Sequence, residues 1–488
     1  MLVQTKNGTL CGAEMDGISV FKGIPYAKPP VGELRWRAPQ PVKNWNGIRS
    51  AIKFGFASIQ PVFDNEAQQI SADNHEPMSE DCLYLNIWTP KSAIEENRRL
   101  PVLVIIHGGG FMYFSGSVEI LQGLELAKKD IVVVTINYRL GAMGFFSHPE
   151  LDKENPDHIS GNYAILDQIA ALKWVQANIA AFGGDPDKVT VSGESAGAFC
   201  VSVLCMTPLA KGLFRGVTAQ SGAFMDRRTV MYQTMTLYEA EKCCEEVCKG
   251  RNLAQLRQMS AEDIMKLTNE IAVKCFMPVQ DGVIFREDPG EVYRGGGFCD
   301  VPLLLGSNSE DGSKFTSRSG DSKELISLAG KLSGADQIDE FLKVYPAGNR
   351  DETVQSQIRL FSDSAFGHNM YAWAKLHEEY GSSRVFLYYY CHIPPDTEFG
   401  AYHSSELYYF LHNLKCGNKN WSAKDYELQE LYSDYILNFV KNGNPNGINL
   451  PEWRSFGDDT NKIMILDEKP HMDRNPTLEA MQFWDKHS

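Results

Sequence analysis

The apolar residues of this chain fall into short, nearly continuous runs separated by longer segments with a helical repeat. Runs near residues 83–89, 101–106, 131–137 and 189–192 are rich in β-branched side chains, which is typical of buried strands. A helical pattern covers residues 164–177, between the last two runs. Because strands that alternate with helices favour parallel pairing, the pattern predicts an α/β fold with a large, mostly parallel sheet flanked by helices.

A motif with chemical meaning follows the last of these runs. The chain reads Gly193-Glu194-Ser195-Ala196-Gly197 between the strand and a segment that can continue as a helix. In this strand–turn–helix setting, Gly-x-Ser-x-Gly is typical of the nucleophile elbow of an α/β-hydrolase. We expect the turn to leave no room for side chains at Gly193 and Gly197, and to hold Ser195 in a strained conformation.

Backbone N–H groups suited to an oxyanion are expected near this serine. The run 101–106 ends in His107-Gly108-Gly109-Gly110-Phe111, where three successive glycines leave the backbone accessible. Two N–H groups of this loop, together with that of Ala196, would form a three-donor oxyanion hole.

A serine hydroxyl also needs a base, and the base needs an acid that orients it. In this fold both follow the serine, the acid first and the histidine second. The apolar run 301–306 is followed by two adjacent carboxylates, Glu310 and Asp311, of which we favour Asp311 because it directly precedes Gly312. Glu310, expected to face solvent or an ion pair, is the alternative.

Several histidines lie beyond Asp311. His403 stands in a polar stretch after the strand candidate 384–390 and before a helical segment, so it is favoured as the base. His392 lies closer to that strand and is the main alternative. His377 lies in a charged helical run and is expected at the surface.

Long sequence blocks extend this pattern over the chain. Residues 182–197 and 80–88 match the two signatures of the type-B carboxylesterases, and further typical blocks run from 22–39 to 438–445. The chain thus resembles the cholinesterase-like branch of the α/β-hydrolases, in particular the compact bacterial para-nitrobenzyl esterase-like carboxylesterases.

This resemblance implies a serine carboxylesterase with Ser195 as nucleophile, His403 as base and Asp311 as acid, where many members carry Glu. Hydrolysis of a carboxylic ester would then pass through an acyl-enzyme, with a small-molecule ester as partner and no metal or organic cofactor. Three alternatives stay open: an acyltransferase with the same triad, amide or carbamate cleavage, and a non-catalytic binding protein on the same fold.

The resemblance also assigns residues around the triad. The implied oxyanion donors are Gly109, Gly110 and Ala196. Ser221 is expected to support the triad. Glu194 adjoins the nucleophile and is expected to be a buried, hydrogen-bonded carboxylate rather than a reacting group.

The cysteines bear on the compartment. Secreted family members pair the cysteine at Cys82 with one about two dozen residues upstream, where this chain has Ser58, so that bridge is not expected. Three cysteines cluster at 243–248, but no second motif completes a metal site. Free thiols, no visible signal peptide and no apolar run long enough to span a membrane predict a cytoplasmic protein.

The net charge of −15 argues against nucleic acid or an anionic membrane as a partner, and the oligomeric state is not readable. Because the candidate catalytic residues are spread along the chain, we expect a single domain over 1–488. Within it, we expect a β-meander at 1–50 and helical insertions at 225–275 and 315–380 that shape the substrate cavity.

Overall fold

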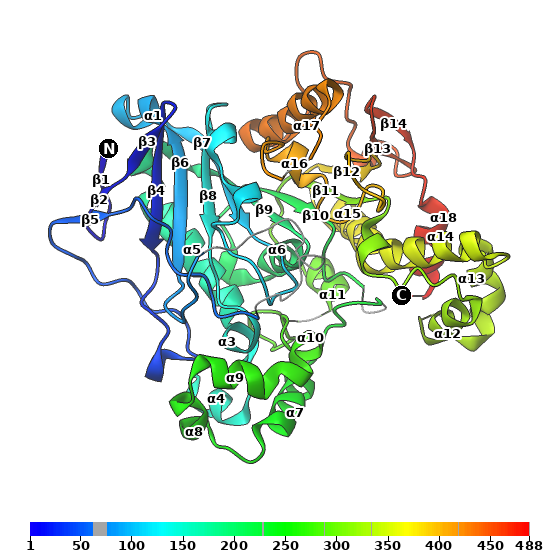
Figure 1. Cartoon of the computed structure of the whole chain (residues 1–488), viewed down its shortest axis with the longest axis horizontal. Helices are drawn as coiled ribbons and strands as arrows, with labels where there is room; N and C mark the ends of the chain where they lie inside the picture. The colour runs from blue at the N-terminus through cyan, green and yellow to red at the C-terminus, as the bar shows by residue number, and fades with distance from the viewer. Residues whose placement is uncertain (62–75, 227–228, 287, 333, 418, 488) are drawn as a thin grey trace. The chain divides into compact units, whose positions relative to one another are not determined.

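The computed structural model describes residues 1–61, 76–226, 229–286, 288–332, 334–417 and 419–487 (Figure 1). These residues fall into two units. The first comprises Met1–Val217 and Thr234–Cys299, and the second comprises Thr218–Gln233 and Asp300–Ser488. Each unit contains strands and helices of its own.

The first unit contains a mixed sheet with the strand order β9-β7-β8-β6-β4-β3. Strand β7 pairs in parallel with β8 and β9, whereas β6 pairs antiparallel with β8 and with β4. All of β7 except Pro101 is buried, as expected of a strand covered on both faces. The strands are β3 (Ala13–Met15), β4 (Ile18–Pro25), β6 (Tyr84–Pro90), β7 (Leu100–Ile106), β8 (Val132–Ile136) and β9 (Gly184–Glu194).

The first fifty residues differ from the predicted meander because they divide between two sheets. Strands β1 (Leu2–Gln4), β2 (Thr9–Cys11) and β5 (Ile48–Ser50) form a small separate sheet. Strand β2 pairs antiparallel with β1 but in parallel with β5. The chain reaches β5 only after β4 and a long irregular segment, so β5 pairs with an earlier strand instead of its neighbour in sequence.

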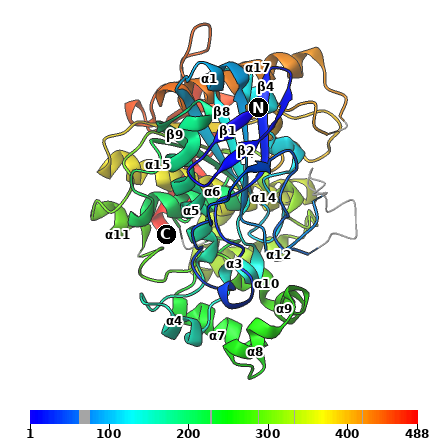
Figure 2. The same cartoon turned by 90° about the vertical axis from the view of Figure 1, so that its left-hand side faces the viewer.

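The helices of the first unit include α5 (Tyr163–Asn178), which confirms the helical pattern predicted at 164–177. Helices α7 to α10 lie within the predicted insertion 225–275, and α9 packs against α3 and α7 (Figure 2). The remaining helices are α1 (Lys91–Glu95), α2 (Leu124–Ala127), α3 (Gly141–Phe145), α4 (Pro149–Glu154), α6 (Ala196–Met206), α7 (Leu237–Cys248), α8 (Leu253–Gln258), α9 (Ala261–Thr268), α10 (Ala272–Cys275) and α11 (Pro289–Arg294).

In the second unit the strands follow the order β10-β11-β12-β13-β14, and β10 begins at the end of the first unit. Strand β12 pairs in parallel with β11 and β13, and β14 pairs antiparallel with β13. The strands are β10 (Gly216–Gln220), β11 (Leu303–Asn308), β12 (Val385–Tyr390), β13 (Lys462–Leu466) and β14 (His471–Arg474).

The helices of the second unit include the longest one described, α17, which starts with a capping box between Ser422 and Asp425 and ends at Gly443 in the left-handed conformation. A π-helix, Ser362–Gly367, joins α14 to α15. The helices are α12 (Ser322–Leu332), α13 (Ile338–Val344), α14 (Arg350–Phe361), α15 (His368–Tyr380), α16 (Leu407–Phe410), α17 (Ala423–Asn442) and α18 (Leu478–His487). Among the described residues, none of the helices meets the length and apolarity needed to cross a bilayer.

Candidate active site

Ser195 occupies a sharp turn between β9 and α6. Its backbone has φ 55° and ψ −129°, a conformation that costs energy for any residue other than glycine. A Cβ atom at Gly193 would lie 2.4 Å from the carbonyl carbon of Gly197, and one at Gly197 would lie 2.2 Å from the carbonyl oxygen of Ile106. Both predictions made for this turn, strain at the serine and no room at the two glycines, are confirmed.

The glycine loop that follows β7 lies against this turn. A Cβ atom at Gly108 would lie 3.1 Å from Cβ of Ser195 and 2.8 Å from the carbonyl oxygen of Glu194. Gly109 and Gly110 follow with φ values of 96° and 60°. The carbonyl of Gly109 accepts hydrogen bonds from the N–H groups of the residues three and four positions later, which closes the loop into a turn. The two segments predicted to supply oxyanion donors therefore meet within the first unit.

His107, at the start of the glycine loop, has a structural role that the sequence did not reveal. Burial lowers the pKa of His107 to about 4, so the ring is neutral at physiological pH. Its Nδ1 atom lies 2.9 Å from the carbonyl oxygen of Gly108, and its ring stacks on Tyr138 at 4.4 Å between ring centres. The hydroxyl of Tyr138 donates to the His107 carbonyl. These contacts fix the first residue of the loop beside Ser195.

Glu194 is buried, with 8% of its surface exposed. Its carboxylate lies against the glycine loop, since Oε2 would be 3.0 Å from a Cβ atom at Gly108. Burial agrees with the interpretation of Glu194 as a supporting carboxylate.

Asp311 is completely buried in the second unit and contacts three groups. Its Oδ1 lies 2.8 Å from Nδ1 of His403. Its Oδ2 accepts hydrogen bonds of 2.8 Å from the hydroxyl of Ser221 and from the backbone N–H of Asn308. Hydrogen bonds of this kind fix a carboxylate in one orientation. The structure thus brings together Asp311, His403 and Ser221, as the sequence predicted.

The neighbouring carboxylate, Glu310, holds the backbone of the histidine loop instead. Glu310 accepts a hydrogen bond of 2.9 Å from the N–H of Ala401, and its own N–H donates to the Ala401 carbonyl. The side-chain amide of Asn308 donates to the carbonyl of Tyr402. The loop that carries His403 is therefore tied to the end of β11 through its main chain. Sequence reasoning missed the part played by Asn308, although its place at the end of β11 is a signal that could have indicated it.

The imidazole of His403 contacts two phenylalanines. Phe366, from the π-helix, stacks on it with 4.5 Å between ring centres, and Phe315 meets it edge-on at 5.2 Å. Phe366 is buried, whereas 36% of Phe315 is exposed. Interruptions of regular helices by a π-turn are frequent at functional sites. No local sequence pattern indicates these contacts, because they join residues far apart in the chain.

The two other histidines considered as bases have different surroundings. His392 is buried against Tyr409 and Asp425, with its Nε2 2.9 Å from the tyrosine hydroxyl and 3.1 Å from the carboxylate. His377 was expected at the surface but is fully buried in α15, near Asp300. The prediction for His377 was wrong because its charged neighbours Lys375 and Glu379 point outward from the same helix.

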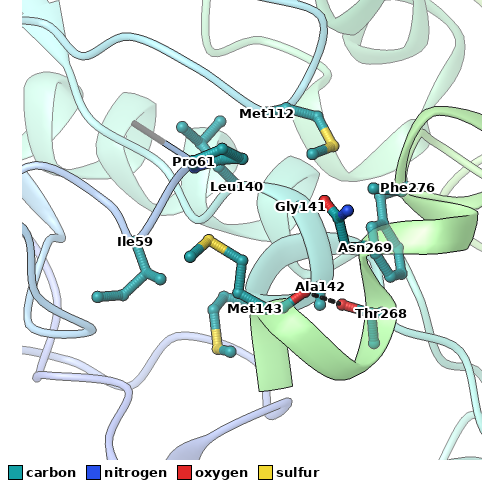
Figure 3. A pocket seen from close by; sticks show the side chains of 12 residues that line it. Ile59, Pro61, Met112, Leu140, Gly141, Ala142, Met143, Thr268, Asn269 and Phe276 are labelled. Atoms are coloured by element: carbon teal, nitrogen blue, oxygen red, sulfur yellow. Dashed lines mark hydrogen bonds between the residues drawn. The ribbon is translucent and has the colours of Figure 1, made fainter. Parts of the chain in front are cut away.

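An apolar pocket lies beside the glycine loop in the first unit (Figure 3). Methionine side chains from three segments contribute to it, and flexible thioethers adapt readily to ligands of different shape. Its lining includes Ile59, Met112, Leu140, Met143, Met265 and Phe276.

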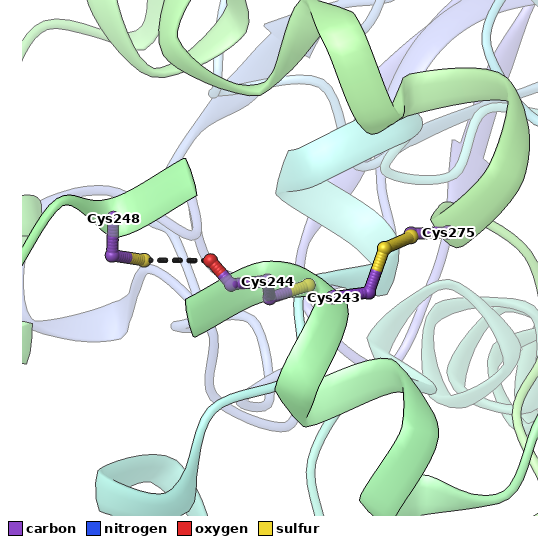
Figure 4. Close-up of a disulfide and its surroundings, with 4 residues drawn as sticks. All are labelled: Cys243, Cys244, Cys248 and Cys275. Atoms are coloured by element: carbon purple, nitrogen blue, oxygen red, sulfur yellow. Dashed lines mark hydrogen bonds between the residues drawn. A yellow bond between two sulfur atoms is a disulfide. The ribbon is translucent and has the colours of Figure 1, made fainter. Parts of the chain in front are cut away.

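A disulfide joins two helices near this pocket. Cys243 of α7 is bonded to Cys275 at the end of α10, the helix that contributes Ala272 to the pocket (Figure 4). This corrects the expectation that the cysteines are all free thiols, which rested on the absence of a recognisable spacing. Cys244 and Cys248 are free, and in the described parts of the chain no three His, Cys, Asp or Glu side chains are grouped to hold a metal ion.

The fold is that of an α/β-hydrolase, with a large, mixed and mostly parallel sheet flanked by helices. A serine at a nucleophile elbow, a glycine loop beside it and a hydrogen-bonded Asp–His pair are typical of this class. The model of the carboxylesterase family matches residues 1–484. The chain belongs to this family, in its type-B branch, and is a carboxylic-ester hydrolase.

Similar proteins support this assignment along the whole chain. The chain is 33% identical to the fumonisin B1 esterase of Sphingopyxis macrogoltabida over 93% of this chain and 84% of that protein. It is 32% identical to the para-nitrobenzyl esterase of Bacillus subtilis over 99% and 98% of the two chains. The solved structure of the Geobacillus stearothermophilus carboxylesterase EST55 covers 99% of each chain with a TM-score of 0.86 and 32% identity.

Proposed function

We propose that the protein hydrolyses carboxylic esters through an acyl-enzyme formed on Ser195. His403 takes the proton of the Ser195 hydroxyl as its oxygen attacks the ester carbonyl, and then returns that proton to the departing alcohol. Asp311 keeps Nδ1 of His403 protonated, so that Nε2 is the basic atom, and stabilises the imidazolium. Water then attacks the acyl-enzyme by the same sequence and releases the acid.

The oxyanion of each tetrahedral intermediate would be bound by the backbone N–H groups of Gly109, Gly110 and Ala196. The contact between the glycine loop and the elbow supports this assignment, because both segments present backbone near Ser195. One donor of this kind contributes about 2.7–4 kcal/mol to lowering the barrier.

The hydrogen bond of 2.8 Å between Asp311 and His403 is the observation that carries the proposal. The other oxygen of Asp311 is held by Ser221 and by the Asn308 N–H, which leaves one carboxylate oxygen for the imidazole. Ser221 therefore acts as a positioning residue for the acid.

The test uses 4-nitrophenyl esters of increasing acyl length with the wild type, Ser195→Ala and His403→Ala. We expect both variants to lose at least about 10⁴-fold in kcat. His392→Ala removes the alternative base and serves as the matched control, because its buried partners are Tyr409 and Asp425. An active Ser195→Ala variant, or a larger loss from His392→Ala than from His403→Ala, would contradict the mechanism.

A second measurement identifies the acceptor of the acyl group. Product analysis with and without an added alcohol shows whether water or the alcohol takes it. We expect the free acid as the main product in both cases.

A further inference from the structure

A short segment just beyond Asp311 contacts the loop that carries His403 through two neighbouring pairs of residues. The ring of Phe315 packs on His403, and the ammonium nitrogen of Lys314 lies 3.7 Å from the centre of the Tyr402 ring. Lys314 and Phe315 are adjacent, as are Tyr402 and His403. The contact between Lys314 and Tyr402 therefore lies directly next to the contact between Phe315 and the proposed base, His403.

Two further cations share the same aromatic surface. The guanidinium of Arg318 lies 5.4 Å from the centre of the Phe399 ring, and Lys314 lies 5.5 Å from that centre. The ammonium of Lys419 lies 5.7 Å from the Tyr402 ring. Attraction between cations and ring faces offsets part of the cost of gathering three positive charges.

The nearby carboxylate of Asp396 offsets part of the positive charge of Lys419. In the part of the chain that the structure describes, Lys314 forms no ion pair with a carboxylate. Asp396 accepts a hydrogen bond of 2.7 Å from the N–H of Asn420, and Glu310 binds the main chain at Ala401. Burial and the nearby Lys419 lower the pKa of Lys314 to about 8. Lys314 is still mostly protonated at pH 7, in a half-buried position.

Such an arrangement is unfavourable by itself, since desolvation and like charges both disfavour the charged lysine. An anion bound between the three cations would remove this cost. Arginine offers a planar fork that matches a carboxylate, and the half-buried ring of Phe399 offers apolar surface for a short methylene chain. The whole chain carries a net charge of −15, so a local positive cluster would also counter its general repulsion of anionic substrates.

We propose that Lys314, Arg318 and Lys419 form a subsite for a carboxylate carried by the ester substrate, beside His403. This inference rests on the proposed function and specifies its substrate class. The carboxylate can stand on the acyl side or on the alcohol side of the ester, and both placements use the same recognition chemistry.

Two pairs of substrates separate these placements. On the acyl side, the 4-nitrophenyl monoester of glutaric acid is compared with the 4-nitrophenyl ester of glutaramic acid. On the alcohol side, the butyrate ester of 4-hydroxybenzoate is compared with that of 4-hydroxybenzamide. Within each pair, the carboxylate is replaced by a neutral amide of nearly the same shape. The quantity measured is the ratio of kcat/KM for the carboxylate to kcat/KM for the amide.

We expect Lys314→Gln to lower this ratio at least tenfold in one of the two pairs, and Arg318→Gln and Lys419→Gln to lower it about threefold or more. Lys314→Arg keeps the charge and should hold the ratio within about threefold of the wild type. Lys331→Gln removes an exposed lysine at the end of α12 and should leave the ratio unchanged. A ratio that Lys314→Gln leaves unchanged in both pairs overturns the proposal.

Direct binding distinguishes a failure of this subsite from a failure of the proposed mechanism. Calorimetry with glutarate and with 4-hydroxybenzoate is performed on Ser195→Ala, with and without Lys314→Gln. Binding of one of the two acids that weakens at least tenfold on adding Lys314→Gln supports the subsite even if no ester is cleaved. Failure of both acids to bind overturns it even if neutral esters are cleaved.

Discussion

Glu310 and Asp311 are adjacent in sequence but hold different parts of the same loop. Asp311 binds the imidazole of His403, whereas Glu310 binds the main-chain N–H of Ala401. One carboxylate can therefore orient the ring while the other sets the position of the backbone that carries it.

These different contacts predict that isosteric substitutions of Asp311 and Glu310 have unequal effects on kcat. Asp311→Asn should lower kcat by about 10³–10⁴-fold, because an amide at this position favours the wrong tautomer of His403 and stabilises no imidazolium. Glu310→Gln keeps a carbonyl oxygen that can accept from Ala401, so it should lower kcat by less than about tenfold. The measurement is kcat on a 4-nitrophenyl ester across pH. A greater loss from Glu310→Gln would show that Glu310 is the acid.

The close packing of the nucleophile elbow predicts that a single added methyl group at Gly197 strongly lowers activity or stability. In Gly197→Ala the added Cβ would lie 2.2 Å from the carbonyl oxygen of Ile106, so either the elbow shifts or the protein is destabilised. We expect at least a hundredfold loss of kcat or a clear fall in the unfolding midpoint.

Gly330→Ala provides the control for this substitution. Gly330 lies in α12, and a Cβ atom there would meet no atom within 4 Å. Alanine is the better helix former, so this variant should be more stable by about 0.5–1 kcal/mol and fully active. Loss of activity in Gly330→Ala and normal activity in Gly197→Ala would contradict the steric argument.

How far the sequence could predict this site depends on how local each feature is. The elbow at Ser195 and the loop at Gly109 were predictable because their constraints lie within a few residues. Glu310 and Asp311 could not be separated by composition, since they follow the same strand. Only the position of a loop whose contact residues lie 91 and 92 positions later distinguishes them. The general fold was predictable from the alternation of strands and helices.

Other features depended on contacts between distant segments. The burial of His377 was missed because its side chain points inward from a helix whose sequence is rich in charge. The pairing of Cys243 with Cys275 follows no spacing rule, since it requires α7 and α10 to meet. The Phe366 ring on His403 likewise depends on a π-turn that no pattern of apolar residues indicated.

The disulfide between Cys243 and Cys275 predicts how many thiols the protein has before and after reduction. Of the 11 cysteines, nine lie outside the disulfide. A thiol-specific reagent in denaturant should therefore detect nine thiols before reduction and 11 after it. Cys243→Ser should lower the free energy of unfolding by about 3–4 kcal/mol under oxidising conditions, because the bond closes a long loop in the unfolded chain. Cys11→Ser, which breaks no bond, is the control, and 11 thiols before reduction would contradict the prediction.

The burial of His377 predicts that the folded protein loses stability in mild acid. Burial lowers the pKa of His377 to about 4, whereas an unfolded histidine has a pKa near 6.5. Between these values the unfolded chain binds a proton that the folded protein does not, so the contribution of His377 to stability falls as the pH drops from 6.5 to 4. The total change is at most about 3 kcal/mol.

The measurement compares urea unfolding at pH 7 and pH 4.5 for the wild type and His377→Gln. The variant should lose less stability between the two pH values than the wild type. His471→Gln, at an exposed histidine, should behave as the wild type. Equal losses in the wild type and His377→Gln would show that His377 is not buried in its neutral form.

The contact between Ser58 and Cys82 predicts that a disulfide can be introduced between these two positions. The Ser58 hydroxyl forms a hydrogen bond with the Cys82 side chain, although burial still raises the pKa of that thiol to about 12. Because the two side chains are in contact, Ser58→Cys should form a disulfide with Cys82 under oxidising conditions. Closing this loop of about two dozen residues stabilises by about 3 kcal/mol in the chain-entropy description. Loss of the hydrogen bond that Ser58 accepts from the Leu140 N–H offsets about 1 kcal/mol of that gain.

The unfolding midpoint of Ser58→Cys should therefore rise in oxidising buffer and fall slightly below that of the wild type in reducing buffer. The double substitution Ser58→Cys with Cys82→Ala should show no rise in either buffer, and a rise there would mean that the gain does not come from the bond.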